Sequence, residues 1–187
     1  MRKTLEQMDM APQHIERLLS FTTVHQVPKG TCFLKPDVAA DSVYFLEQGL
    51  IRSYRLIEGE DLTYMFYFPN DFCVDFYAFL TNTPSQLYFD AMTDVVVHQL
   101  KKEHTQLLYN EIHEIERYGR LMAEKAFVIV SERFKDMQAM EAKDRYVKLM
   151  LRNPELLQQI PQKHIATYLN IKPESLSRIK SQLAGAR

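Results

Sequence analysis

The sequence predicts an α+β fold with an N-terminal antiparallel jelly-roll barrel (residues 1–109), a long helix (110–140) and a C-terminal unit of short crossing helices (141–187). Three observations predict this fold. Short apolar runs separated by turn residues fill the first hundred residues, a proline-free stripe of helical period follows, and two short amphipathic stretches meet at Asn170. A chain of 187 residues, 46% of them hydrophobic, can hold one sizeable domain and a small one.

The barrel prediction rests on the strand-like runs between Thr22 and Leu100, which follow short helical segments in Met1–Leu19. Leu50–Ile57 and Leu62–Phe68 flank Glu58–Asp61, a pattern typical of a β-hairpin. About eight short strands at this spacing favour a jelly roll built of two antiparallel sheets.

The long helix is predicted from a stripe of helical period between Lys101 and Met137 that contains no proline. From Glu111 it would run for about 27 residues, or roughly 40 Å. A rod of this length beside a small barrel offers an apolar face to a second copy, so we expect a homodimer; burial of the helix on its own barrel is the alternative. The stripe consists of Leu107, Leu108, Ile112, Ile115, Met122, Ala126, Ile129, Arg133 and Phe134.

The C-terminal unit begins with an amphipathic helix in Glu141–Arg152 and a helical connector in Glu155–Gln159. Ile160–Leu183 then predicts two helices that cross at a tight turn. Asn170 suits a left-handed turn because it tolerates a positive φ, and Ile171 would fill the angle between the helices. The apolar positions at helical spacing are Ile165, Leu169, Leu176, Ile179 and Leu183.

The charge of this last unit is opposite to that of the rest of the chain. Its cations are Lys163, Lys172, Arg178, Lys180 and Arg187. Against Glu174 alone, five minus one gives +4, and the chain total of −1 leaves −5 for residues 1–159. A basic end on an acidic body predicts a polyanionic partner, double-stranded DNA, for a helix-turn-helix at that end. The alternative is a helical hairpin that caps a core and has a solvated basic rim.

The segment PQKHIATYLNIKPESLSRIKSQL, Pro161–Leu183, resembles the reading unit of the CRP/FNR (cyclic-AMP receptor protein and fumarate-nitrate regulator) transcription factors. With the barrel and long helix before it, the chain is similar to the short forms of Bacteroidetes-type bacteria. The resemblance implies a cyclic-nucleotide-binding-like sensor barrel, a hinge near Ala139–Asp144, and a dimer on a promoter palindrome. RNA polymerase would be a further partner.

The second helix of the unit, Pro173–Leu183, would lie in the major groove. Arg178 can donate to guanine and Glu174 can accept from cytosine. The family pattern Arg-Glu-x-x-Ser/Gly-Arg lies over Pro173–Arg178, with Pro173 in place of the first Arg. The family's β-hairpin wing is missing, because only Ala184–Arg187 follow, so binding per half-site should be weaker. The predicted DNA-binding residues are Gln162, Lys163, Lys172, Glu174, Ser175, Ser177, Arg178 and Lys180, of which Gln162 and the lysines would contact phosphate.

The barrel departs from the family at the positions that would hold a cyclic nucleotide. The affected residues are Val74 in place of Gly, Asp75 in place of Glu, and Ser85, Gln86 and Leu87 around the expected Arg. No Lys or Arg occurs from Leu56 to Leu100, so a buried phosphate would have no cation from this stretch. Cyclic-nucleotide binding is not expected. The many rings of the stretch leave open a neutral or apolar small-molecule effector. A sensor that binds no small molecule and responds to a protein partner, or to its abundance alone, is the other alternative.

No catalytic, cofactor or metal site is predicted. The six histidines are scattered, and no His-x-His, G-x-S-x-G or glycine-rich phosphate loop is present. Cys32 and Cys73 are too few for an iron–sulfur cluster and indicate, with no signal peptide, a reduced cytoplasmic setting. No apolar run approaches the roughly 18 residues of a membrane span.

Two functions remain after a cupin-type enzyme is set aside for lack of its metal ligands. The first is a dimeric transcription regulator that reads DNA. The second is an effector-binding or protein-interaction module whose helix-turn-helix is only structural.

Overall fold

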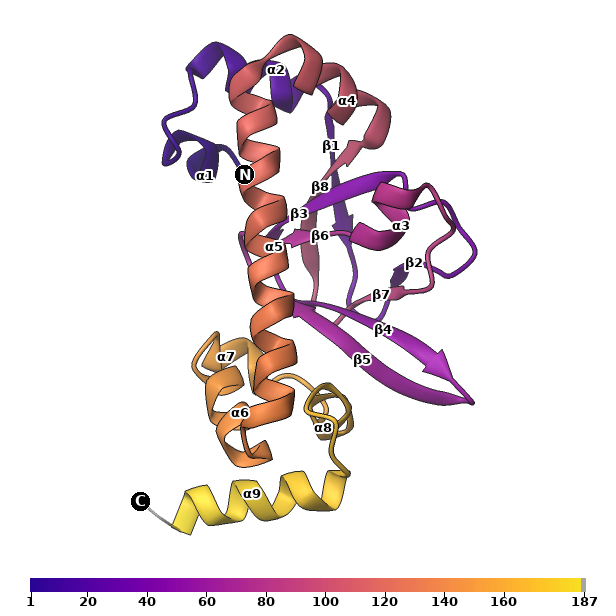
Figure 1. The fold of residues 1–187 in the computed structure, drawn as a ribbon, viewed down its shortest axis with the longest axis vertical. Coiled ribbons are helices and arrows are strands. Elements are labelled where there is room, and N and C mark those ends of the chain that lie inside the picture. Colours follow the sequence, from indigo (N-terminus) through magenta and orange to yellow (C-terminus); the bar gives the residue numbers. More distant parts are fainter. Residues whose placement is uncertain (186–187) are drawn as a thin grey trace.

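The computed structural model describes residues 1–185 as a β sandwich flanked by a long helix, with a group of short helices at one end (Figure 1). Two short helices, α1 (Arg2–Glu6) and α2 (Pro12–Ser20), come first, as predicted. They share a core cluster with the start of the long helix through Leu5, Ile15 and Ile115. The N-terminal segment therefore ties one end of the sandwich to that helix.

The sandwich consists of two antiparallel four-stranded sheets, in the orders β1-β8-β3-β6 and β2-β7-β4-β5. The strands are β1 (Thr22–Val27), β2 (Cys32–Leu34), β3 (Ser42–Gln48), β4 (Ile51–Ile57), β5 (Glu60–Tyr67), β6 (Phe72–Cys73), β7 (Tyr88–Ala91) and β8 (Val95–Lys101), with the short helix α3 (Phe76–Thr81) after β6. The predicted antiparallel double-sheet architecture is confirmed. Leu46, Ile51, Phe89 and Val97 fill the space between the sheets.

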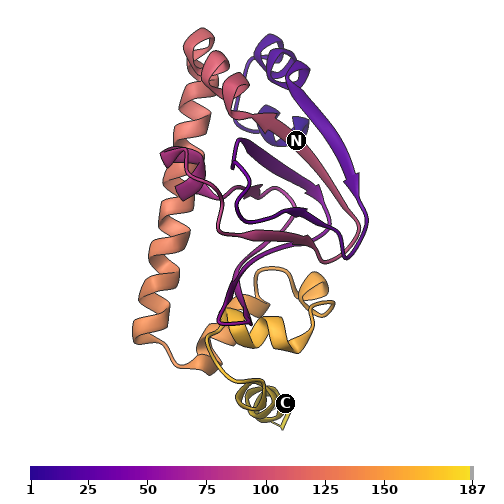
Figure 2. The same cartoon turned by 90° about the vertical axis from the view of Figure 1, so that its right-hand side faces the viewer.

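The β4–β5 hairpin extends from the sandwich toward the C-terminal helices (Figure 2). Ile57 pairs with Glu60, so only Glu58 and Gly59 form the loop. Both have positive φ, 53° and 84°, as a two-residue type I′ turn requires. The turn is shorter than the predicted Glu58–Asp61, and Asp61 therefore belongs to β5.

The long helical stretch is two helices, α4 (Lys102–Glu111) and α5 (His113–Ala139). Helix α5 has 27 residues, the length predicted for the rod, and begins two residues after Glu111. Ile112 between them is extended, with φ −136° and ψ 103°. The Tyr109 ring packs on the bare backbone of Gly119, where a Cβ would collide with its hydroxyl. Gly119 thus allows α4 to lie close against α5.

Most of the predicted stripe on α5 faces the protein's own sandwich. Ile115 is buried, and Met122 and Ile129 pack against core clusters. Phe134, also predicted as part of the stripe, is exposed instead, and so is Phe127, which lay outside it. No helix within residues 1–185 has the length and apolar character needed to cross a bilayer.

Four helices end the described chain: α6 (Ala142–Met150), α7 (Pro154–Leu157), α8 (Gln162–Tyr168) and α9 (Pro173–Gly185). Asn170, between α8 and α9, has a φ of 54°, as its predicted turn role requires. Ile165, Leu169 and Leu176 are buried, and Ile171 packs against the same cluster. The two predicted helices and their turn are therefore present.

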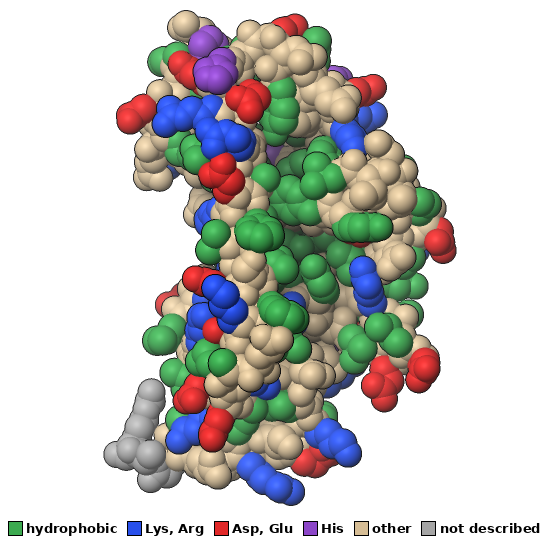
Figure 3. Space-filling model, viewed as in Figure 1, with side chains coloured by type: hydrophobic (Ala, Val, Ile, Leu, Met, Phe, Trp, Pro, Cys, Tyr) green, Lys and Arg blue, Asp and Glu red, His purple; other side chains and the backbone are tan. Residues whose placement is uncertain are grey.

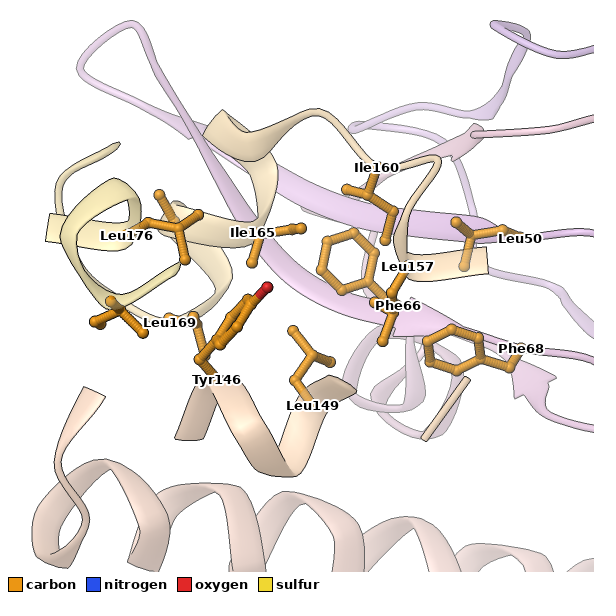
Figure 4. Close-up of a cluster of buried hydrophobic side chains, with 12 residues drawn as sticks. Leu50, Phe66, Phe68, Tyr146, Leu149, Leu157, Ile160, Ile165, Leu169 and Leu176 are labelled. Carbon is orange, nitrogen blue, oxygen red and sulfur yellow. The ribbon is translucent and has the colours of Figure 1, made fainter. Parts of the chain in front are cut away.

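One hydrophobic cluster joins these helices to the sandwich (Figure 4). Phe66 of β5, Phe68 just after it and Leu50 lie in it together with Tyr146, Leu157 and Ile165. The side chains of the strand and of the helices point toward one another (Figure 4). The C-terminal helices thus have no core separate from the sandwich.

Candidate nucleic-acid interface

Helix α9 lies at the end of the molecule with one long face in solvent (Figures 1 and 2). Leu176 and Ile179 bury its inner face. On the outer face Glu174, Ser177 and Arg178 are exposed, and Ser175 is half-buried. The predicted base-reading side chains therefore share one accessible helix face.

The residues predicted to contact phosphate surround this face. Gln162 and Lys163 begin α8, Lys172 precedes α9 and Lys180 lies on α9, and all four are exposed. Lys and Arg side chains project from this end of the molecule (Figure 3). Arg187, which contributes to the predicted charge, lies outside the described residues.

Helix α8 is docked on the β4–β5 hairpin by a buried ionic cluster that the sequence did not predict. The Arg52 side chain is 2% exposed and donates to both carboxylate oxygens of Asp61, at 2.6 and 2.9 Å. The same guanidinium donates to Nδ1 of His164 on α8 at 2.5 Å and lies 3.4 Å from Asp90. In the sequence, the one indication of this cluster was an arginine within an apolar strand.

A pair of threonines extends the contact between α8 and the hairpin. Thr167 Oγ1 accepts from the Thr63 backbone N–H at 3.2 Å and donates to Thr63 Oγ1 at 3.0 Å. The Tyr168 ring lies 5.2 Å from the ring of Phe66. Polar and apolar contacts together fix where α8, and through it α9, points.

Two arginines hold the end of α8 from the opposite side. Arg133 of α5 donates to the Tyr64 carbonyl on β5 and, at 3.1 Å, to the Tyr168 carbonyl, and its guanidinium lies 4.2 Å from the centre of the Tyr168 ring. Arg145 of α6 donates to the Leu169 carbonyl at 3.0 Å. The last carbonyls of a helix are favourable sites for such cations. Arg133 thereby links sandwich, long helix and α8.

This docking should weaken in acid because His164 must stay neutral. Burial, and then the neighbouring Arg52, lower the pKa of His164 to about 4, although Asp61 and Asp90 oppose the shift and Lys163 adds to it. The unfolded chain, with an ordinary histidine pKa near 6.5, binds the proton more readily, so stability is full above that pH and falls toward pH 4. We expect a loss of about 2 kcal/mol between pH 7 and pH 5 from this group.

The measurement is urea unfolding at pH 7, 6 and 5 for the parent and for His164→Gln. Subtracting the two profiles removes carboxylate titrations that both proteins share. Parallel profiles would show that His164 does not titrate as described.

Most of the positions predicted as a degenerate effector pocket are buried, and two of them bond to each other. Val74, Asp75, Ser85 and Leu87 are buried, and Gln86 is exposed. Asp75 caps α3 by accepting from the Ala78 N–H at 3.2 Å, and its second oxygen accepts from Ser85 Oγ at 2.9 Å. Both carboxylate oxygens are therefore engaged within the protein.

A cavity of about 150 Å³ opens between β5, α3 and α5, and Val74, Asp75 and Leu87 of the predicted pocket line it. The stretch Leu56–Leu100 supplies no cation to it, as the sequence shows. Arg55, Lys125 and Arg152, from elements on either side of that stretch, do line it. The cations of this cavity therefore come from outside the stretch that the sequence analysis considered.

The two thiols have no sign of activation. Burial raises the pKa of the Cys32 thiol to about 11 and also raises that of the fully buried Cys73. In the part of the chain that the structure describes, no three His, Cys, Asp or Glu side chains are grouped as metal ligands.

Residues 24–111 match the family model of the cyclic nucleotide-binding domain. FixK2 from Bradyrhizobium japonicum superposes with a TM-score of 0.74 at 21% identity, over 88% of this chain and 85% of its own. The regulator CLP from Xanthomonas campestris, described as c-di-GMP responsive, gives 0.74 at 15% identity, over 94% and 93%. A structure from Eubacterium rectale assigned to the CRP/FNR family of transcriptional regulators gives 0.72 at 16%, over 97% and 87%.

At these identities the likenesses show a shared fold. The chain has the sandwich, long helix and C-terminal helices of structures that include CRP/FNR regulators. Comparison with curated proteins gives no match.

Proposed function

We propose that the chain is a dimeric, sequence-specific DNA-binding transcription regulator of the CRP/FNR type, in its short form. The observation that carries the proposal is the division of α9 into a buried apolar face and an accessible face bearing Glu174, Ser177 and Arg178. The three units are the sensor sandwich (1–109), the dimerisation helix (110–140) and the helix-turn-helix (141–187). The protein acts in the cytoplasm, beside RNA polymerase, and is not an enzyme.

The accessible face of α9 suits the major groove. Arg178 forks onto guanine O6 and N7, and Glu174 accepts from cytosine N4. Lys163, Lys172 and Lys180, with Gln162, contact phosphates on either side and set the register. Within residues 160–185, four cations against Glu174 leave a charge of +3, so affinity falls with salt.

The experiment that tests this function is selection of genomic fragments bound by the purified protein, followed by titration of the enriched sequence at several salt concentrations. A palindrome with half-sites about one helical turn apart is expected. Recovery of no enriched sequence would favour the interaction-module alternative, in which the α8–hairpin contact is purely architectural.

The dimer seam is the exposed face of α5. Its apolar residues recur at alternating spacings of four and three, the pattern of a two-stranded coiled coil, and all of them are exposed. They are Ala123, Phe127, Val130, Phe134 and Met137. Phe127 and Phe134 are 74% and 63% exposed, which a second copy of α5 would cover. A two-fold axis along α5 gives the pair of reading helices that a palindrome requires.

Phe127→Glu combined with Phe134→Glu is expected to convert the dimer to a monomer, because the seam would bring four carboxylates together. Sedimentation velocity measures the change, and far-ultraviolet circular dichroism checks the fold. Leu80→Glu is the matched control, since Leu80 on α3 is 67% exposed outside the seam. A double variant that still sediments as a dimer would place the interface elsewhere.

Cyclic AMP and cyclic GMP are expected to leave the melting temperature unchanged at 1 mM. Asp75, which would hold the ribose hydroxyl, is already bonded to Ser85 and to the N-terminus of α3. No cation comes from the loop around Ser85. Differential scanning fluorimetry makes the measurement, and a saturable rise would contradict the assignment.

A further inference from the structure

The cavity between β5, α3 and α5 is apolar and ring-lined, and nothing in the DNA-reading function uses it. Figure 3 shows hydrophobic side chains around a hollow between the long helix and the sandwich. Phe66 and Tyr67 form its buried wall, whereas Tyr64 and Tyr77 remain well exposed at its edge. The aromatic side chains that line it are Tyr64, Phe66, Tyr67, Phe72, Phe76 and Tyr77.

The volume limits what can enter. An apolar cavity of about 150 Å³ accepts roughly one benzene ring. Ring pairs in offset or edge-to-face contact gain about 0.5–1.5 kcal/mol beyond burial. The cavity therefore fits a single aromatic ring, and any further atoms of the ligand would reach its mouth.

The charges around the cavity do not balance. Its carboxylates are already engaged: Asp75 as described above, and Asp71 by the Phe68 N–H at 2.9 Å and by Arg152 at 3.5 Å. Arg55 Nε is buried and has no hydrogen-bond partner within residues 1–185. Lys125 is exposed at the α5 side. A buried donor without a partner costs about 1–3 kcal/mol, which a bound anion would recover.

We propose that this cavity binds a monocyclic aromatic carboxylate, with its ring among the aromatic side chains and its carboxylate on Arg55 and Lys125. The site overlaps the degenerate nucleotide position, because Val74, Asp75 and Leu87 line it, but the cations Arg55 and Lys125 come from outside that position. The proposal goes beyond DNA reading and rests on no property of α9.

The test compares 3-phenylpropionate with 3-phenylpropionamide, which has the same ring and length but no charge, by isothermal titration calorimetry on the full chain. The acid is expected to bind one site per chain at least tenfold more tightly than the amide. Arg55→Gln and Lys125→Gln should each lower the affinity for the acid toward that of the amide and leave the affinity for the amide unchanged. Lys35→Gln, an exposed cation outside the cavity, should change neither.

Ala126→Trp supplies a second arm by filling the cavity from α5 and should abolish binding of both probes. Equal affinities for acid and amide in the parent would overturn the role of Arg55 and Lys125. Octanoate binding as tightly as 3-phenylpropionate would overturn the aromatic class. Because the assay contains no DNA, its failure and a failure of DNA reading are separate results.

Discussion

Arg178→Ala is expected to weaken operator binding by the dimer at least about 30-fold without changing the fold. A bidentate contact to guanine is worth about 1–3 kcal/mol, and both half-sites lose it, so about 2–6 kcal/mol disappears from a symmetric complex. Arg178 is exposed, so its truncation removes no buried packing. Fluorescence anisotropy on the selected palindrome at fixed salt measures the loss.

Lys172→Ala is the comparison that separates recognition of bases from electrostatic attraction to phosphates. A lost phosphate contact should weaken binding uniformly across sequences and reduce the salt slope by about one per half-site. Arg178→Ala should instead abolish the preference for guanine at one position of each half-site, and Glu174→Ala the preference at another. Lys29→Ala, an exposed cation on the sandwich, should bind as the parent does. If Arg178→Ala keeps its full sequence preference, α9 does not read bases as proposed.

Asp61→Ala is expected to lower the free energy of unfolding by about 3 kcal/mol. The change leaves the guanidinium of Arg52, whose side chain is 2% exposed, with only Asp90 at 3.4 Å as an ionic partner. Removing one member of a buried pair is costly because the other charge stays buried. Urea unfolding at pH 7.5 measures the difference, and limited proteolysis after Met140 reports whether α8 has loosened from the hairpin.

Glu16→Ala is the matched control, because it removes the partner of Arg2 in an exposed pair with the same shortest distance of 2.6 Å and should change stability little. Arg52→Met with Asp61→Leu should regain part of the stability lost by Asp61→Ala, since an apolar pair leaves no uncompensated charge. Equal stabilities of Asp61→Ala and Glu16→Ala would show that Arg52 is satisfied without Asp61.

Local patterns predicted well those elements that are specified by neighbouring residues. The strands could be predicted because turn residues end each apolar run. Gly59 supplies the positive φ of the hairpin loop. The helices α8 and α9 could be predicted because apolar residues keep helical spacing on both sides of Asn170. These residues are Ile165, Leu169, Leu176 and Ile179. The outward position of Arg178 followed from the same spacing.

Features that depend on contacts between distant segments were not predictable from such patterns. The break at Ile112 arises where Tyr109 packs on Gly119, a contact that the uninterrupted apolar stripe conceals. The apolar stripe also does not determine which face of α5 packs against the sandwich. Burial of His164 against Arg52 joins residues 112 positions apart, so no window of sequence contains both.

The hydrophobic cluster shared by β5 and the C-terminal helices determines how the protein can be divided. A fragment ending at Met140 would leave Leu50, Phe66 and Phe68 without their partners Tyr146, Leu157 and Ile165. A fragment of residues 141–185 would lack the opposite wall. Expressed separately, each piece would present bare apolar surface and would tend to aggregate, so truncated versions are poor reporters of either half.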